Sequence, residues 1–344
     1  MKIQHLILVV AGLAAGLVQA AFAQQQCLPL EPRLEVVHGP EGGARKDFLG
    51  RAMLIKAFHA DRDLDLVRYT KWAMEVTSEV CRRCEQQAVR LEELRAAHAG
   101  AGLDVLCITG DREQPAGRWM DVNRVKAAWA LDEHGDLLDV VDPMQRCEAV
   151  LADANGRIVW RGDVLRLDGK VIEGALAEAF VEPMHAWKGG LDGVRQALRR
   201  GEWAKALERA RRVEGAVGLA TKLERQLAGK LELFERAAKE GDWLAVQLRG
   251  EELEKALLGD ARRAQVLATL AGLAADREAQ RVLAAQRQVR EARAMQLTRT
   301  RERATAKARM EALCDEHGGT AAAANARVLL ARIARFETEA RGMR

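Results

Sequence analysis

The prolines of this chain divide it into two parts of different character. All six lie at or before Pro183, and the remainder of the chain is rich in Ala, Leu, Arg, Glu and Gln, which are strong helix formers. A proline-free tract of this length with repeated glycines is typical of consecutive antiparallel helices. We therefore predict an all-α domain over residues 183–344.

Before that boundary, strand-like and helix-like patterns alternate along the chain. The predicted order is a strand at 52–58, a helix at 85–99, a strand at 103–109, a helix at 119–126, a strand at 127–131 and a helix at 172–180. Two further apolar runs, 149–153 and 157–161, flank Ala154-Asn155-Gly156, which is a β-hairpin signal. This pattern predicts an α/β domain over residues 24–182, with a mixed sheet covered by helices on both faces.

The N-terminus has the features of a secretory signal peptide, which we place at residues 1–23. Lys2 supplies a positive start, residues 6–23 form an apolar run, and Ala21-Phe22-Ala23 matches a small-x-small cleavage site. The alternative is an uncleaved membrane anchor, for which the apolar run is short. We expect an exported protein, periplasmic or extracellular, without a stable membrane anchor once the signal is removed.

Charge and cysteine usage exclude several classes of protein. The formal net charge of +4 is small, acids and bases are interleaved, and no basic block with interleaved aromatic residues occurs, so nucleic-acid binding is not expected. Disulfides persist in exported proteins, but six cysteines in 344 residues are too few for a disulfide scaffold. Cys107, in an apolar strand pattern, is expected to be a buried small hydrophobe, and Cys314 is expected to serve helix packing.

The candidate chemical site is Cys81-Arg82-Arg83-Cys84. It precedes a predicted helix and an apolar strand, an order that indicates a thioredoxin-like dithiol rather than a zinc knuckle. One helical turn separates the two thiols, which we expect to bridge without backbone movement. At a helix N-terminus the backbone dipole favours the Cys81 thiolate as nucleophile, Arg82 and Arg83 add positive charge, and Cys84 acts as the resolving thiol.

Together these segments resemble the exported thioredoxin-like thiol-disulfide oxidoreductases of the TlpA and redoxin type. Residues 48–58 are similar to that family's approach to its first strand, residues 81–109 fit its motif, helix and second strand without a gap, and residues 150–162 are similar to its closing hairpin. The resemblance covers about residues 34–180. It implies a thioredoxin-like fold, catalysis by Cys81 and Cys84, a protein disulfide or dithiol as partner, and no cofactor.

The sequence departs from the family pattern at three places. Residues 61–80 separate the first strand from the cysteines, and they form either an extra helix or a backward extension of the motif helix. Val80 stands where an aromatic residue usually precedes the first cysteine. Cys147 replaces the cis-proline expected before the hairpin and is a possible third thiol. With His59 at the same sheet edge, three thiols would suit Zn²⁺ or Cu⁺, although we expect no metal.

A second register also remains open. If the chain is aligned directly from Phe58, the motif position falls on residues 63–66 and the active site is absent. Cys81 and Cys84 would then be ordinary residues inside a helix. The gapless fit after Cys84 favours the first register.

Two segments of the predicted helical domain echo each other. Residues 198–207 and 237–246 both read as helix, glycine turn, tryptophan and helix, at a spacing in the range of helical-hairpin repeats. Residues 310–323 resemble a tetratricopeptide-like hairpin in which Thr320 caps the second helix. Because stacked hairpins usually bind proteins, we expect protein–protein contact through these helices. The strongly charged segment 286–309 is expected to be a long exposed helix or a dimer contact.

Two functions therefore remain open. The first is thiol-disulfide exchange on protein substrates through Cys81 and Cys84. The alternative is a non-catalytic protein-binding scaffold with a degenerate thioredoxin-like domain. The position of Cys81 discriminates between them, because an exposed helix start favours the enzyme and a buried position in mid-helix favours the scaffold.

Overall fold

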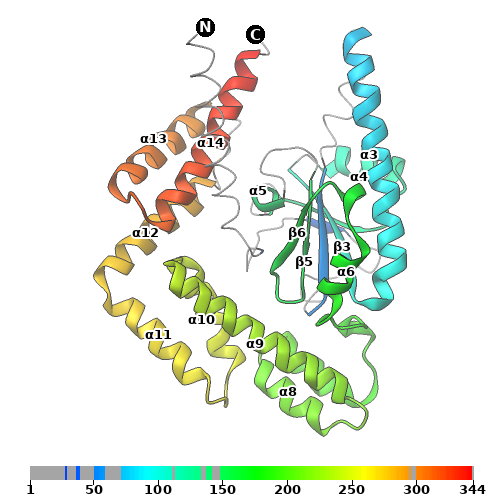
Figure 1. Ribbon diagram of the computed structural model, residues 1–344, viewed down its shortest axis with the longest axis vertical. Helices are drawn as coiled ribbons and strands as arrows, with labels where there is room; N and C mark the ends of the chain where they lie inside the picture. The colour runs from blue at the N-terminus through cyan, green and yellow to red at the C-terminus, as the bar shows by residue number, and fades with distance from the viewer. Residues whose placement is uncertain are drawn as a thin grey trace. The chain divides into compact units, whose positions relative to one another are not determined.

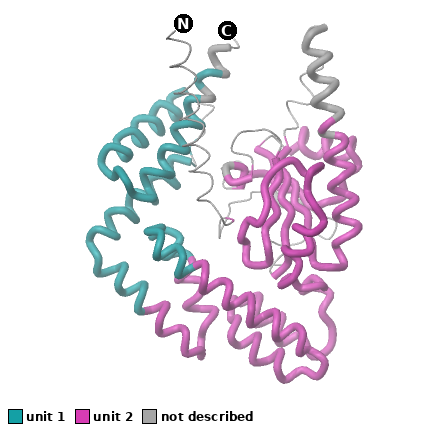
Figure 2. The backbone as a smooth tube through the Cα atoms, in the orientation of Figure 1, with its two compact units in different colours: residues 1–26, 234–248, 268–344 teal, residues 27–233, 249–267 magenta. Residues whose placement is uncertain are grey.

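The computed structural model describes the following residues: 28, 36–38, 50–58, 71–110, 113–132, 137–141, 148–293, 295 and 300–342. The predicted signal peptide, residues 1–23, lies outside them. The chain divides into two compact units, coloured separately in Figure 2. One comprises residues 27–233 and 249–267, and the other comprises residues 1–26, 234–248 and 268–344. The domain boundary expected at residue 182 stays a prediction.

The described strands form one mixed, six-stranded sheet in the order β1-β4-β3-β2-β5-β6. Their bounds are β1 (Val36–His38), β2 (Ala52–Ala57), β3 (Leu103–Thr109), β4 (Ala128–Leu131), β5 (Ala149–Ala152) and β6 (Ile158–Gly162). The strands β2, β3 and β4 are parallel, whereas β1 runs antiparallel to β4, and β5 runs antiparallel to both β2 and β6. This strand order, with a closing hairpin, is that of a thioredoxin-like α/β sheet region.

Helices cover the two faces of the sheet unequally. The helices of this region are α3 (Lys71–His98), α4 (Glu113–Val122), α5 (Leu138–Val141) and α6 (Gly169–Leu176). Because β2, β3 and β4 step across the sheet in one direction and parallel crossovers are right-handed, the connecting helices α3 and α4 lie on the same face. With α6 they cover a core that includes Leu54 and Leu151, while the short α5 packs on the opposite face (Figure 1).

Most of the predicted elements of this region are confirmed with shifted ends. The strands predicted at 52–58, 103–109 and 127–131 are β2, β3 and β4, and the predicted hairpin is β5–β6. The helix predicted at 119–126 is α4, which already ends at Val122. It stops there because Arg124 adopts a φ of +56° and the Val125 N–H donates to the Met120 carbonyl at 2.9 Å, as in a helix-ending Schellman motif. The strand β1 was not predicted.

The remainder of the chain is helical, as its composition predicted. Its α-helices are α7 (Asp192–Arg199), α8 (Trp203–Arg212), α9 (Val217–Glu240), α10 (Trp243–Ala256), α11 (Arg263–Ala275), α12 (Arg277–Arg293), α13 (Thr300–Glu316) and α14 (Ala321–Gly342). None of the helices in the described part of the chain combines the length and hydrophobicity needed to cross a membrane.

The two segments that echo each other in sequence have the same local structure. Gly201 and Gly241 adopt φ values of +78° and +70°, which glycine tolerates without strain. In each case the following N–H donates, at 2.9 Å, to the carbonyl five residues earlier, and the next helix begins at a tryptophan. The two segments of similar sequence therefore form similar turns. A tetratricopeptide-like array of the helices stays a prediction.

The helices α12, α13 and α14 share an apolar core that includes Val289, Met310 and Ile333, and they lie side by side in Figure 1. The single long helix expected over residues 286–309 is wrong, because α12 ends at Arg293 and α13 begins at Thr300. The Thr320 side chain accepts a hydrogen bond from the Ala323 N–H at 3.3 Å, which confirms its predicted capping role.

Candidate functional site

Both cysteines of the predicted site lie inside α3. Because this helix begins at Lys71, the expectation that Cys81 stands at a helix start is wrong. Of the two possibilities for residues 61–80, a backward extension of the motif helix holds for residues 71–80. His59 and residues 61–70 lie outside the described residues. The roles predicted for Cys81 and Cys84 are not tested by this placement of the backbone and stay predictions.

The position of Cys81 in the helix changes the electrostatics expected for its thiol. The partial positive charge of the helix dipole is concentrated in the first turn, whereas Cys81 follows residues 71–80 of the same helix, about three turns of it. Its backbone N–H therefore lies beyond the first turn, where each backbone N–H already donates to a carbonyl of the same helix. The helix terminus that was expected to stabilise a Cys81 thiolate is absent from this position.

The predicted bridge between Cys81 and Cys84 stays a prediction, because the side chains of these two residues lie outside those that the structure describes.

The face of α3 that packs on the sheet is defined by residues that follow the motif. Ala88 and Leu91 are fully buried in the core between α3 and the sheet. A buried stripe of this kind is the usual inward face of a packed helix.

Arg83, the second of the two arginines in the motif, forms an ion pair with Asp163, which follows β6. Arg83 donates to Asp163 Oδ2 at 2.6 Å, and Gln87, one turn further along α3, donates to Asp163 Oδ1 at 2.8 Å. Asp163 also caps the 3-10 helix η4 (Val164–Arg166), because its side chain accepts from the Leu165 N–H at 3.1 Å. One carboxylate thus fastens the motif helix to the segment that follows the closing hairpin.

The environment of Asp163 favours its ionised form. Burial alone raises the pKa of this carboxyl, but hydrogen bonds from Gln87, Arg83 and the Leu165 N–H, together with the charge of Arg83, outweigh burial and lower it below the usual range. Since Asp163 is ionised at neutral pH, it neutralises the Arg83 guanidinium. The positive charge that Arg83 was expected to lend to the cysteine thiols is therefore compensated.

Of the four remaining cysteines, Cys107 and Cys314 lie among the described residues. Cys147, the possible third thiol, is outside the described residues. Cys107 is fully buried in β3, where burial raises the pKa of its thiol to about 12 although the nearby charge of Lys56 lowers it. Cys107 is thus confirmed as a buried small residue. The Cys314 thiol lies 3.7 Å from the Ala323 carbonyl of α14, which confirms its packing role.

Metal ligation finds no support in the part of the chain that the structure describes. Within those residues, no three side chains of His, Cys, Asp or Glu are grouped so that they could hold a metal ion. The proposed set of three thiols and an imidazole includes Cys147 and His59, which are outside them.

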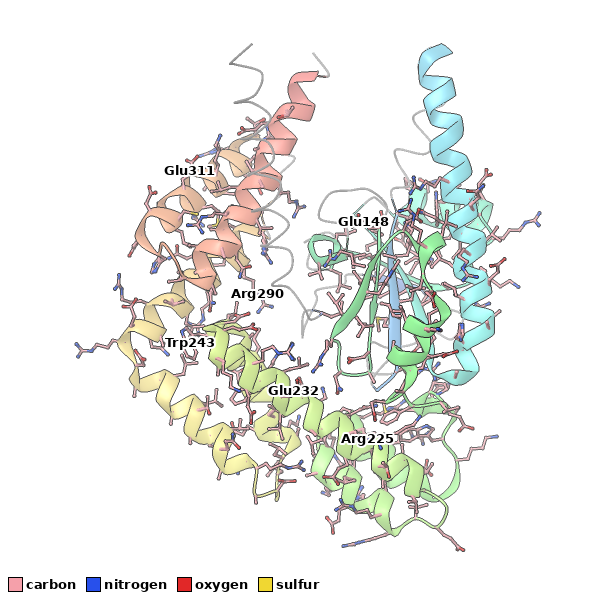
Figure 3. All side chains as sticks on the ribbon, viewed as in Figure 1. Glu148, Arg225, Glu232, Trp243, Arg290 and Glu311 are labelled. Atoms are coloured by element: carbon pink, nitrogen blue, oxygen red, sulfur yellow. The ribbon has the colours of Figure 1, made fainter. Side chains whose placement is uncertain are left out.

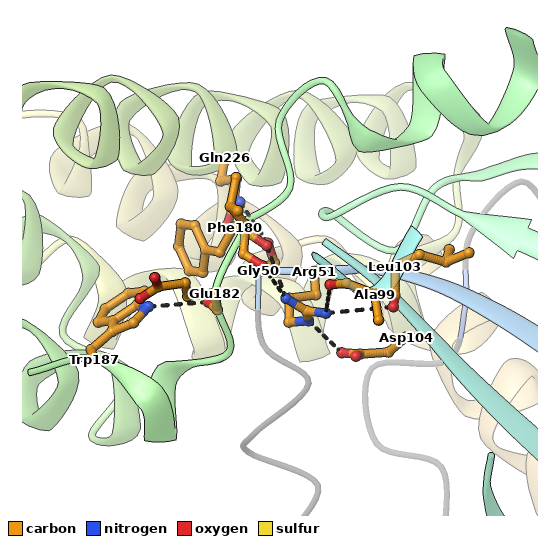
Figure 4. Close-up of polar contacts among 10 residues, drawn as sticks. Gly50, Arg51, Ala99, Leu103, Asp104, Phe180, Glu182, Trp187 and Gln226 are labelled. Atoms are coloured by element: carbon orange, nitrogen blue, oxygen red, sulfur yellow. Dashed lines mark hydrogen bonds and ion pairs between the residues drawn. The ribbon is translucent and has the colours of Figure 1, made fainter. Parts of the chain in front are cut away.

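A second polar centre lies at the opposite end of the sheet, where β2 and β3 begin (Figure 4). Arg51 is 5 % exposed, and its guanidinium donates to the Asp104 carboxylate at 2.8 Å. The same guanidinium donates to four backbone carbonyls, those of Phe180, Val181, Ala99 and Leu103. A planar group with five donors suits such a junction, so Arg51 joins the starts of β2 and β3 to the ends of α3 and α6.

Sequence reasoning passed over the residues that make these contacts, although one of them carries a local signal. Asp163 directly precedes a short helical turn, which is a typical capping position. No local pattern indicates that Asp163 binds Arg83, because the two residues are 80 positions apart.

The fold has solved structural neighbours among thioredoxin-like proteins. The thioredoxin domain of a thiol-disulfide oxidoreductase from Bacteroides vulgatus is 16 % identical, with 44 % of this chain and 97 % of that chain covered and a TM-score of 0.28. A secreted disulfide oxidoreductase of Mycobacterium tuberculosis is 12 % identical over 42 % of this chain and 96 % of that chain, with a TM-score of 0.28. Peroxiredoxin Q of Xanthomonas campestris is 13 % identical over 44 % and 92 %, with a TM-score of 0.29.

These neighbours are thioredoxin-like, as the resemblance predicted, but at low identity and over part of the chain. No protein-family model matches the chain, and no curated protein matches it. The assignment of a thioredoxin-like sheet region rests on the strand order and the helix placement described above.

Proposed function

We propose that this protein is a non-catalytic protein-binding scaffold, in which a thioredoxin-like region has lost thiol-disulfide exchange. The observation that carries the proposal is the continuous run of α3 through both cysteines of the predicted site. The compensated charge of Arg83 adds to it. A thiol in mid-helix lacks the free backbone donors of a helix N-terminus, which favour the thiolate in reactive cysteines.

The helical region is the proposed binding part of the scaffold. It supplies successive helices from α7 to α14, and such arrays usually present surfaces for other proteins. We also propose that the protein is exported, on the basis of the apolar run at residues 6–23 and its cleavage site.

The second candidate is thiol-disulfide exchange through Cys81 and Cys84. The strand order of the sheet and the two-residue spacing of the cysteines support it. It requires α3 to open at residues 81–84, so that a sulfur gains free backbone donors. Because the Arg83–Asp163 ion pair stabilises the closed helix, opening also has to break this pair.

The experiment that separates the two candidates measures the acidity of the Cys81 thiol. The alkylation rate at Cys81 in the native, reduced protein is followed against pH by mass spectrometry, with Cys84→Ser as the matched variant. We expect slow alkylation of Cys81 at neutral pH, as for an unactivated thiol, and no insulin reduction above background, while a thioredoxin run in parallel is active. A Cys81 pKa below about 7, or insulin reduction that Cys81→Ser abolishes, would refute the scaffold.

The scaffold also makes a positive prediction in the cell. In a strain from which the gene has been deleted, the double variant Cys81→Ser/Cys84→Ser should restore the wild-type phenotype as fully as the unaltered gene does. Failure of the double variant, at equal protein level and equal thermal stability, would favour the enzyme.

A further inference from the structure

One face of α9 is lined by residues that contact the thioredoxin-like region. Lys222, Arg225, Gln226, Gly229 and Glu232 follow one another at intervals of three, one, three and three residues, so they share one side of the helix. Their partners come from the end of α6, the residues before β2 and the turn of the β5–β6 hairpin. Arg225 and Glu232 are labelled on α9 in Figure 3.

Gln226 makes the central contact of this face. Its side chain is completely buried, and its amide nitrogen donates to the Glu178 carbonyl at 2.6 Å and to the Gly50 carbonyl at 3.1 Å (Figure 4). The Gly50 carbonyl also accepts from the Phe180 N–H at 2.7 Å. The carboxamide of α9 therefore completes a hydrogen-bonded junction between the start of β2 and the end of α6.

Gly229 lies directly against the Asn155 side chain of the hairpin turn. A Cβ atom at this position would lie 2.4 Å from Asn155 Nδ2 and 2.9 Å from Asn155 Cγ, so a side chain there would require the Asn155 side chain to move. Three residues further along α9, Glu232 forms an ion pair of 3.0 Å with Arg157, which follows the same turn. The Asn155 side chain thus occupies the space that a side chain at position 229 would take.

The same contact surface includes four buried side-chain atoms that make no hydrogen bond to the described residues. Among the residues that the structure describes, five buried side-chain atoms make no hydrogen bond. Four of them belong to this surface, namely Asn155 Oδ1, Arg157 Nε, Glu178 Oε2 and Gln226 Oε1. Each such atom disfavours the closed arrangement, because water would satisfy it when the surfaces separate.

We propose that the base of the sheet is a helix-docking site whose occupant is α9, and that this helix docks reversibly. Gln226 and Gly229 make the docked state specific, and the four unpartnered atoms lower the free energy needed to undock. The thioredoxin-like region then does not end at residue 182. It includes the contacting face of α9, which can separate from the sheet. The proposal is independent of whether Cys81 and Cys84 react.

A pair of engineered cysteines tests the docking in the full-length chain. Because Asn155 Cγ is 2.9 Å from the Cβ position of residue 229, the double variant Asn155→Cys/Gly229→Cys should form a disulfide under mild oxidation. The matched control is Asn155→Cys/Gly218→Cys, because Gly218 lies on the same helix and a Cβ there has no neighbour within 4 Å. Both pairs are made in a background in which the native cysteines are replaced by alanine.

Hydrogen exchange then tests reversibility. We expect the amides of Ala52 and Phe180 to exchange at least tenfold more slowly in the oxidised, locked Asn155→Cys/Gly229→Cys protein than in the same protein after reduction. Equal exchange in the two forms would show a permanently closed surface and overturn reversibility. Equal disulfide yield in the test pair and the Gly218 control would overturn the docking itself.

Alanine substitutions give a second readout that does not depend on a disulfide. Glycine lowers helix stability relative to alanine at exposed positions, so Gly218→Ala should raise the melting temperature. Gly229→Ala should instead lower it and accelerate exchange at Phe180, because its methyl group meets Asn155. A stabilising effect of both substitutions would contradict the docked arrangement.

Discussion

Replacing Asp163 by alanine tests the contact that ties the cysteine-containing helix to the rest of the fold. The substitution removes the cap of η4, which is worth about 0.5–2 kcal/mol. It also leaves Gln87, 3 % exposed, without its partner, at about 1–3 kcal/mol. The ion pair with Arg83 adds little, about 0.2–1 kcal/mol, because the arginine side chain is 59 % exposed. Allowing for non-additivity, we expect a loss of about 2–4 kcal/mol.

The measurement is urea unfolding followed by tryptophan fluorescence, with Asp168→Ala as the matched control. Asp168 caps α6 in the same way, through its contact with the Lys170 N–H at 2.7 Å, but its side chain makes no ion pair with another described residue. The control should therefore lose only the capping contribution, about 1 kcal/mol. If Asp163→Ala is no more destabilising than Asp168→Ala, the inferred anchoring of α3 by Asp163 is wrong.

Four further outcomes can be checked. Because the folded-state pKa of Asp163 is lowered, its contribution to stability is present above the unfolded pKa of about 3.9 and disappears as the pH falls through the lower folded value, so Asp163→Asn should flatten the acid limb of a stability–pH profile. Gly50→Ala should cost about 2–4 kcal/mol in thermal or urea unfolding, since its φ is +75° and its Cβ would lie 2.2 Å from the Phe180 ring. Cys107, with a pKa near 12, should resist alkylation at pH 8 in the native protein and react only on unfolding. Gln286→Leu should cost about 1–3 kcal/mol by calorimetry, because the buried Gln286 side chain bonds the start of α10.

Local patterns were sufficient for most of the secondary structure. Apolar runs predicted β2 and β3, and Ala154-Asn155-Gly156 predicted the β5–β6 hairpin, because strand patterning and turn chemistry act over a few residues. The glycines at 201 and 241 likewise predicted where two helices end. The start of α3 was not predictable in this way, since residues 61–80 contain neither glycine nor proline to mark a boundary.

The candidate site was predictable in composition but not in geometry. The sequence singled out Cys81 and Cys84 and the arginines between them. It could not show that the helix begins at Lys71, nor that Asp163 forms an ion pair with Arg83. Both facts alter the expected acidity of the thiols, and the second depends on a residue that only folding brings close.

The sequence by itself determined that this chain pairs a region of alternating strands and helices with a long helical tract, because residue periodicity, turn residues and the absence of proline are local constraints on the backbone. The tertiary structure alone decided how distant segments meet. Gln226 bonds the Gly50 carbonyl across 176 residues, and the Asn155 side chain packs against Gly229. Such contacts depend on complementary shape and on hydrogen-bonding groups buried together, which no short stretch of sequence specifies.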